Sequence, residues 1–269
     1  LRKQAGSADH LGLNNSLPAT CFPTAATMAN SWDQELAEEM GKALGLEAAS
    51  LGVHVLLGPG LNIKRSPLCG RNFEYFSEDP YLSGKMAAGY IRGLQAAGVA
   101  ACPKHFACNN QEDNRNFVSS NLSQRALREI YLRPFEYAVR KGGAKGIMTS
   151  YNKINGVWSH YNYDLVTTIL RDEWGFDGNV ITDWWMRKAK MPEFPKIKNN
   201  AYRVRAQVDV LMPGNMSYRK GYRQDKGQLK SLGKPGGLTR GELQRSAKNV
   251  LTVALRKLQK EKDKIYQNT

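Results

Sequence analysis

Short apolar segments alternate with helical segments along this chain of 269 residues, and no other feature constrains the fold as much. The segments predicted as strands are residues 53–57, 99–102, 146–150, 179–182 and 207–211. Helical periodicity fills the intervals, with predicted helices at 31–52, 79–98, 123–141, 163–173 and 239–260. Strands that alternate with helices predict a parallel α/β sheet.

Several helix boundaries have recognisable signals. Ser31 followed by Gln34 predicts an N-cap with a capping box, as does Thr239 followed by Glu242. Asp79-Pro80 predicts a helix start with proline in the first helical position. Three of the five tryptophans are assigned to the core rather than to a site, namely Trp32, Trp174 and Trp185.

The sheet is expected to close as a barrel. A nucleotide-type Gly-x-Gly-x-x-Gly does not follow the first predicted strand, which favours a (β/α) barrel over a doubly wound sheet. We expect residues 1–269 to form a single (β/α) barrel domain. In such barrels the reactive side chains follow the carboxyl ends of the strands.

Those strand ends carry a mixture of charged and aromatic residues that suits a sugar. Charged side chains hydrogen-bond sugar hydroxyls, and indole faces pack against the apolar faces of the ring. Asp183 follows the strand at 179–182. With Lys, Arg and His side chains nearby, its pKa is expected to be lowered, which suits a carboxylate nucleophile.

The net charge of +15 is confined to the last third of the chain. Residues 1–184 hold 18 basic and 18 acidic residues, whereas residues 185–269 hold 21 basic and 6 acidic ones. Aromatic residues are too sparse in the basic segment 186–205 to favour nucleic-acid binding, although 218–223 comes closer. The amphipathic last helix predicts a docked surface helix with its charges outward. A basic interface and an ordinary solvated surface both stay open.

Other classes are excluded by simple counts. No stretch approaches the ~20 apolar residues of a membrane helix, so no membrane association is expected. The four cysteines lack a metal-type Cys-x-x-Cys pairing, which indicates free thiols and a reducing, cytoplasmic compartment. No metal or organic cofactor is expected, because no His/Cys/Asp cluster has ligand spacing.

Four ordered motifs resemble the barrel domain of glycoside hydrolase family 3. They are GRNFEYFSEDP at 70–80, KHF at 104–106, GIMTSYN at 146–152 and GFDGNVITDW at 175–184. The resemblance implies an incomplete (β/α)8 TIM-like barrel and an exo-acting retaining β-glycosidase that releases terminal β-linked glucose or xylose. The alternative is a catalytically incomplete carbohydrate-binding fragment or accessory protein.

The resemblance also implies roles for individual residues. Asp183 matches the nucleophile, and the residues matched to substrate binding are Arg71, Lys104, His105, Met148, Tyr151 and Trp184. For His105 a buried structural role stays open. Glu74 is expected to form an ion pair with Arg71. Glu112 and Arg115 are expected either to line the pocket edge or to form a solvated salt bridge.

Two departures from the family pattern predict a piece of a larger enzyme. The acid/base glutamate of β-glucosidase-like members comes from an α/β-sandwich domain, which we expect to be the partner of this chain. This glutamate-dependent branch fits better than the N-acetylglucosamine-active branch, because the second histidine of the latter is absent from Ala107-Cys108-Asn109-Asn110. The Asp-Gly-Pro-His-Gly turn of the family is expected before Leu1, so the first barrel strand is expected to be missing. The sequence leaves sugar preference, homo-oligomerisation and secretion open.

Overall fold

The computed structural model describes residues 18–186, 200–212 and 230–267, with side chains up to Leu255. Helices of the first half are α1 (Ala25–Ala29), α2 (Gln34–Ser50), η1 (Asn72–Glu74), α3 (Pro80–Ala96), α4 (Gln124–Ala126), η2 (Leu127–Tyr131) and α5 (Arg133–Arg140). Those of the second half are η3 (Ser159–Tyr161), η4 (Asp164–Glu173), α6 (Ala201–Arg205) and α8 (Arg240–Gln267). The strands are β1 (Val55–Leu56), β2 (Ala100–Ala101), β3 (Ser119–Ser120), β4 (Gly146–Met148), β5 (Lys153–Ile154), β6 (Val157–Trp158) and β7 (Asn179–Ile181).

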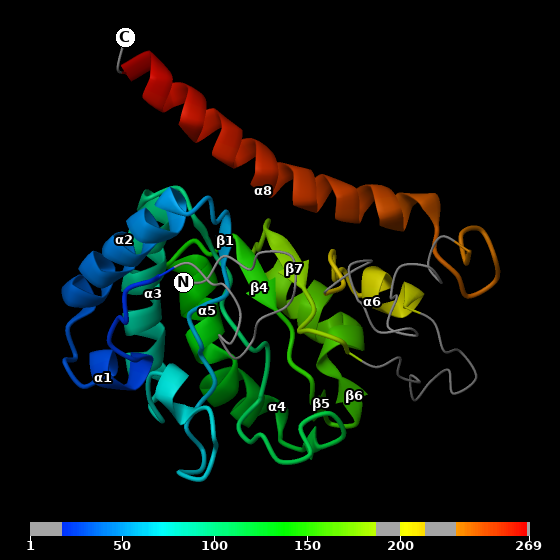
Figure 1. Ribbon diagram of the computed structural model, residues 1–269. Helices are drawn as coiled ribbons and strands as arrows, with labels where there is room; N and C mark the ends of the chain where they lie inside the picture. Colours follow the sequence, from blue (N-terminus) through cyan, green and yellow to red (C-terminus); the bar gives the residue numbers. More distant parts are fainter. Residues whose placement is uncertain (1–17, 187–199, 213–229, 268–269) are drawn as a thin grey trace.

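The central strands are parallel and lie side by side in chain order (Figure 1). β1 pairs with β2, and β4 pairs with β7. A bridge between Phe106 and Thr149 connects the segment after β2 to the segment after β4. Helices separate each central strand from the next central strand, with α3 after β1, α5 between β2 and β4, and η4 before β7. This order is the arc of a (β/α) barrel.

The predicted strand at 207–211 is reduced to a single bridge between Ile181 and Val210. The side chain of Asp209 explains the loss of regular pairing. Its Oδ2 accepts a hydrogen bond from the backbone N–H of Val180, at 2.9 Å, in place of a strand carbonyl. The other predicted strands are present but shorter than expected.

The first helix boundary differs from the prediction by two residues. Asp33, not Ser31, caps α2, because its Oδ1 accepts from the backbone N–H of Leu36. The Ser31 hydroxyl instead accepts from the N–H of Asp33 and donates to the carbonyl of Met28. The predicted cap of α3 at Asp79 is confirmed.

The helices predicted at 123–141 and 163–173 contain π-helical turns at η2 and η4. Pro134 supplies a reason in the first case. Proline has no N–H for the preceding turn, and the helix widens just before it, with the N–H of Leu132 bonded to the carbonyl of Leu127.

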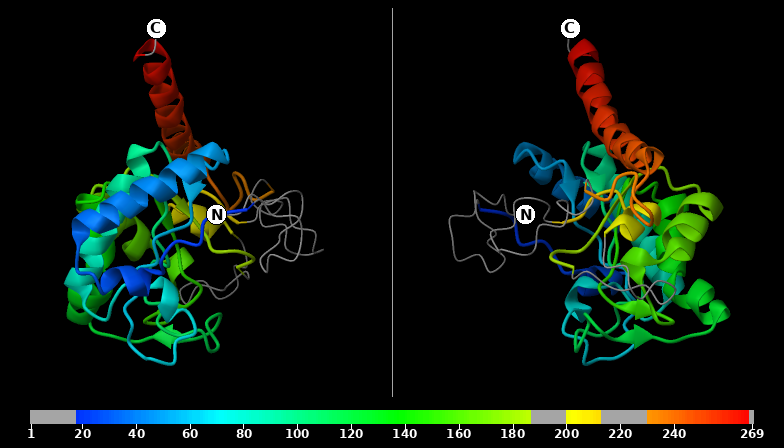
Figure 2. Two further views of the ribbon diagram at one scale, coloured as in Figure 1. Left: turned by 60° about the vertical axis from the view of Figure 1, so that its left-hand side comes forward. Right: turned by 90° about the vertical axis from the view of Figure 1, so that its right-hand side faces the viewer.

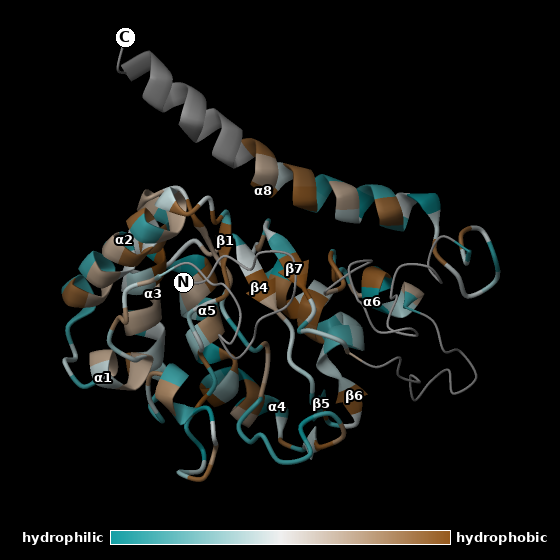
Figure 3. Ribbon diagram, viewed as in Figure 1, coloured by the Kyte–Doolittle hydropathy of each residue, from teal (hydrophilic) through white to brown (hydrophobic). Residues whose placement is uncertain are grey.

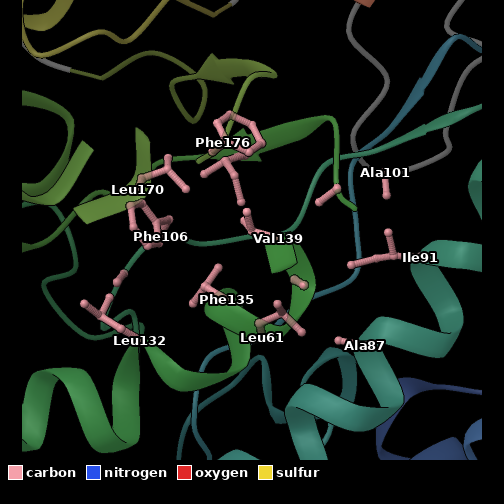
Figure 4. Packing of buried hydrophobic residues seen from close by; sticks show 14 of the residues in the cluster. Leu61, Ala87, Ile91, Ala101, Phe106, Leu132, Phe135, Val139, Leu170 and Phe176 are labelled. Atoms are coloured by element: carbon pink, nitrogen blue, oxygen red, sulfur yellow. The ribbon is translucent and has the colours of Figure 1, made fainter. Parts of the chain in front are cut away.

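The main core lies between the sheet and the helices that cover it (Figure 4). Phe106, which follows β2, stacks edge-on against Phe135 of α5 and against Trp174. The core assignment of Trp174 is therefore confirmed. That of Trp32 is wrong, because its side chain is 78% exposed in the turn between α1 and α2. Trp185 is half-buried and belongs to none of the described hydrophobic clusters.

Glycines allow α2 and α3 to approach closely. A Cβ atom on Gly93 would lie 1.9 Å from the carbonyl oxygen of Glu38 and 2.7 Å from the backbone nitrogen of Lys42. We expect Gly93→Ala to lower the free energy of unfolding by about 1–3 kcal/mol, because rigid backbone must move. Urea unfolding measures this. Gly241→Ala is the control, since nothing lies within 4 Å of that position and alanine favours helix. Equal midpoints for the two variants would contradict the prediction.

The last helix, α8, begins as predicted and docks over only part of its length. The capping box is confirmed, with Thr239 N–H donating to Glu242 and Glu242 N–H donating to Thr239. Leu243 packs against the cluster of Ala201, Val204 and Leu238. Further along, apolar side chains are exposed, and the helix extends away from the body (Figures 1, 2 and 3). The expectation of a docked helix is therefore wrong at Leu251 and Leu255.

The basic segment can be compared with its predictions only in part. Arg203 is fully buried and donates to His160, and Arg205 pairs with Glu242. Neither side chain is an ordinary solvated surface charge. Residues 187–199 and 218–223 lie outside the described residues.

Candidate active site

The predicted site residues follow the carboxyl ends of the parallel strands. They are Arg71 after β1, Lys104 and His105 after β2, Tyr151 after β4, and Asp183 and Trp184 after β7. Met148 is the last residue of β4 itself. Because these strand ends meet at one edge of a barrel, side chains far apart in sequence come together there.

Asp183 is held at the centre of this group. Its side chain is 12% exposed. Oδ1 accepts a hydrogen bond from the backbone N–H of Trp184, at 2.7 Å, which fixes the orientation of the carboxylate. Oδ2 lies 3.6 Å from Nε2 of His105. One carboxylate oxygen is therefore anchored and the other is directed into the site.

The predicted lowering of the Asp183 pKa is wrong in direction. Burial raises the pKa of this carboxyl above its ordinary value, while the Trp184 N–H, Arg71, Arg115 and Lys104 act in the opposite sense. The sequence shows these charges but not the extent of burial. Loss of hydration disfavours the carboxylate more than the cations and the hydrogen bond favour it.

A chain of ion pairs organises the cations around Asp183. Glu74 connects two of them, pairing with Arg71 and, at 3.0 Å, with Lys104. Glu112 pairs with Arg115 and lies 4.0 Å from Arg71. The predicted ion pair between Arg71 and Glu74 is confirmed. For Glu112 and Arg115, a partly buried salt bridge next to the site combines the two expected roles.

His105 is buried, with hydrogen-bond partners for its backbone and for Nδ1, and its Nε2 faces Asp183. Its backbone N–H and carbonyl both pair with the side chain of Asn62, at 2.9 Å each. Its Nδ1 lies 3.1 Å from the hydroxyl of Tyr75. Burial, reinforced by Arg71 and other nearby cations, lowers the pKa of His105 well below its usual range. The imidazole is therefore neutral. Its burial and hydrogen bonds agree with the structural role, and its Nε2 faces Asp183.

Aromatic side chains form the wall beside Asp183. The Tyr151 hydroxyl donates to the carbonyl of Trp184, at 2.5 Å, and the Arg115 guanidinium lies 4.6 Å from the centre of the Tyr151 ring. Met148 is buried in a small cluster with Cys102 and Ile181, against which Trp184 packs. Met148 thus supports the wall through Trp184.

Three residues near the site were not assigned a role from the sequence: Asn62, Tyr75 and Asn109. Asn62 follows the strand exit after β1, and Tyr75 lies within the GRNFEYFSEDP motif, so strand position and motif could have indicated both. Asn109 gave no signal of its own. Its Nδ2 donates to the hydroxyl of Tyr75, at 3.2 Å, and to Glu112, at 3.0 Å.

Within the ranges that the structure describes, no three His, Cys, Asp or Glu side chains form a group able to hold a metal ion. In the same ranges, no helix combines the length and apolar character needed to cross a bilayer. All four cysteines are unpaired; Cys21 is exposed, whereas Cys69, Cys102 and Cys108 are buried.

Comparison with known proteins identifies the family. Residues 7–253 match the profile described as the glycosyl hydrolase family 3 N terminal domain. The chain is 45% identical over 263 residues to thermostable beta-glucosidase B of Acetivibrio thermocellus, covering 98% of this chain and 33% of that protein. It is 54% identical over 185 residues to an exo-alpha-(1->6)-L-arabinopyranosidase of Bifidobacterium longum, covering 68% of this chain and 24% of that protein.

Solved structures agree with the sequence matches. Beta-glucosidase 3B of Thermotoga neapolitana superposes with a TM-score of 0.79 at 42% identity, covering 92% of this chain and 34% of that one. The beta-glucosidase of Kluyveromyces marxianus gives a TM-score of 0.82 at 36% identity, covering 91% and 28%. The predicted incomplete TIM-like barrel is thereby confirmed.

This chain therefore spans about a quarter to a third of the length of these relatives. Its match to the family profile covers most of its own residues and includes every strand exit described above. The chain belongs to glycosyl hydrolase family 3, as part of the N-terminal domain of that family.

Proposed function

We propose that the protein containing this chain is an exo-acting retaining β-glycosidase that releases terminal β-linked glucose or xylose. Asp183 is the nucleophile. The observation that carries the proposal is the geometry of this carboxylate, with Oδ1 held by the N–H of Trp184 and Oδ2 directed toward His105.

The reaction has two steps. In the first, an oxygen of Asp183 forms a bond to the anomeric carbon as the bond to the leaving oxygen breaks, and a glycosyl-enzyme results. In the second, water attacks the anomeric carbon and frees the carboxylate. Arg71, Lys104 and His105 carry the N–H donors that bind the hydroxyls of the sugar in both steps.

A retaining enzyme also needs a carboxyl group that gives a proton to the leaving oxygen and later takes one from water. Glu74 does not suit this task. Burial raises its pKa, but Lys104 and Arg71 outweigh burial, so the pKa of Glu74 is lowered. Glu112 is occupied by its ion pair with Arg115. We therefore assign the acid/base to a glutamate in a sandwich domain outside this chain.

A slow substrate tests the proposal. The full-length protein is incubated with a 2-deoxy-2-fluoro-β-glucoside that has a good leaving group, and its mass is followed. The electron-withdrawing fluorine slows both steps, and the good leaving group restores the first, so the glycosyl-enzyme should accumulate with the fluorosugar on the peptide that contains Asp183.

Two controls make the experiment decisive. An Asp183→Asn variant should remain unlabelled under the same conditions. A fluoroxyloside assayed in parallel compares the two sugars. An adduct on another carboxylate would contradict the assignment of Asp183, and sugar binding without turnover or adduct would indicate a carbohydrate-binding protein instead.

A further inference from the structure

We propose that Tyr75 and Asn109 are positioning residues that fix the tautomer of His105 and so place its Nε2–H against Asp183. The inference rests on the proposed function for its catalytic consequence, although the tautomer can be observed without activity. It is drawn from a line of contacts that runs from Glu112 through Asn109 and Tyr75 to His105.

The direction of the hydrogen bonds begins at Glu112. Its carboxylate forms a salt bridge with Arg115, and a carboxylate can only accept. The Asn109 atom 3.0 Å from Glu112 Oε1 must therefore be the amide nitrogen, not the amide oxygen. The same nitrogen is 3.2 Å from the hydroxyl oxygen of Tyr75, to which it donates its other proton.

The next step follows from the single proton of a hydroxyl group. Tyr75 is fully buried, and its hydroxyl has two hydrogen-bond partners among the described residues, Asn109 and His105. Because Asn109 donates, the proton of Tyr75 needs an acceptor, and Nδ1 of His105 is the one within reach. If Nδ1 carried the proton instead, the Tyr75 proton would be buried without an acceptor.

Nδ1 is therefore unprotonated, and the one proton of the neutral imidazole resides on Nε2. The charged and titratable groups around this ring are Arg71, Lys104, Arg115, Tyr75 and Asp183. The three cations oppose a second proton on the ring, in accord with its lowered pKa. A proton on Nε2 faces the Asp183 carboxylate at 3.6 Å, which is an attractive contact, whereas a bare nitrogen there would repel it.

The test replaces Tyr75 with phenylalanine in the full-length protein and uses Tyr90→Phe as the matched control. Tyr90 is also buried, on α3, and its hydroxyl does not take part in this line of contacts. We expect Tyr75→Phe to lower kcat by about 10- to 100-fold, because part of the protein then loses the contact between Nε2–H and the charged Asp183 carboxylate. KM should change much less, and Tyr90→Phe should remain within about twofold of the wild type.

Nitrogen-15 NMR of labelled histidine gives the direct readout, with the His105 signal assigned by its loss in His105→Gln. The wild type should show the Nε2–H form alone, and Tyr75→Phe should show a mixture of both tautomers. Asn109→Asp offers a second variant of equal size. Its carboxyl group, 3.0 Å from Glu112, shares a proton with that carboxylate and accepts the Tyr75 proton, so Tyr75 becomes an acceptor for Nδ1–H and the other tautomer should prevail.

The outcomes separate the two proposals. An Nδ1–H tautomer in the wild type, or an unchanged tautomer and kcat in Tyr75→Phe, would overturn the positioning role. A wild-type protein that shows the Nε2–H form but neither hydrolyses nor traps glycosides would refute the proposed function and leave the tautomer assignment intact. Equal losses in Tyr75→Phe and Tyr90→Phe would indicate general damage to the fold and would also overturn it.

Discussion

Replacing Asp183 with asparagine should reduce glycoside hydrolysis by about 10⁴-fold or more in the full-length protein, since the variant lacks the proposed nucleophile. Asparagine keeps the size of the side chain, and its Oδ1 can still accept from the N–H of Trp184. The amide nitrogen in place of Oδ2 cannot attack the anomeric carbon. Steady-state kinetics with an aryl β-glucoside measure the change.

Asp177→Asn provides a matched control. Asp177 precedes β7, whereas Asp183 follows it, so the two carboxylates occupy opposite ends of the same strand. Asp177 is half-exposed and pairs with Lys145. Its replacement should leave kcat/KM within about twofold, because exposed pairs contribute little. Comparable losses in the two variants would contradict the assignment of Asp183.

The Asp183→Asn substitution should not destabilise the protein at neutral pH. Since burial raises the pKa of Asp183 in the folded state, ionising this group opposes folding. The opposition is present at pH 7 and disappears as the pH falls through the raised pKa toward about 4. We expect Asp183→Asn to melt above the wild type at pH 7 and the difference to shrink in acid. A lower melting temperature at pH 7 would contradict this sign.

The chemistry of the site could be predicted from sequence wherever it depends on strand order. Lys104, His105 and Asp183 each follow a short apolar segment, and the ends of parallel strands converge, so proximity follows without coordinates. Tyr75 and Asn109 could not be placed in this way. Tyr75 contacts His105 directly and Asn109 contacts Tyr75, and only the folded path of their segments brings a hydroxyl within 3.1 Å of Nδ1.

The errors in predicting the fold from the sequence also have physical causes. Ser31 and Asp33 are both good capping residues, and two positions separate them, so the sequence does not decide between them. The apolar stripe of α8 indicates which face of the helix can pack but not how much of it meets a partner. Leu243 finds one, whereas Leu251 and Leu255 are more than half exposed. Periodicity predicts which face of a helix is apolar, but the tertiary structure determines how much of that face is buried.

A loss of about 1–3 kcal/mol of unfolding free energy is expected from Asp209→Asn, because buried donors lose an acceptor. The side chain of Asp209 is fully buried, and its Oδ2 lies 2.7 Å from Nη2 of Arg171, itself 8% exposed. Asparagine preserves the shape, but its amide nitrogen replaces one of the two acceptor oxygens. Either Arg171 and the Val180 N–H or the Asn249 amide then faces a donor instead of an acceptor. Urea unfolding of the variant and the wild type measures the difference, with Asp177→Asn as the exposed-pair control.

A double variant separates the cost of an unpaired charge from the value of the pair. Burial raises the pKa of Asp209 more than Arg171 lowers it, and burial likewise lowers the pKa of Arg171, so each partner is held in its charged form against a desolvation penalty. Arg171→Leu with Asp209→Leu should therefore unfold at a higher urea concentration than Asp209→Asn alone. A double variant less stable than the single one would mean that the pair itself stabilises this fold.

Asp209 also accepts from the N–H of Val180, three residues before Asp183, and from Asn249 on α8. Its carboxylate thus connects the last helix to the strand that precedes Asp183, and the activity of Asp209→Asn should fall with its stability.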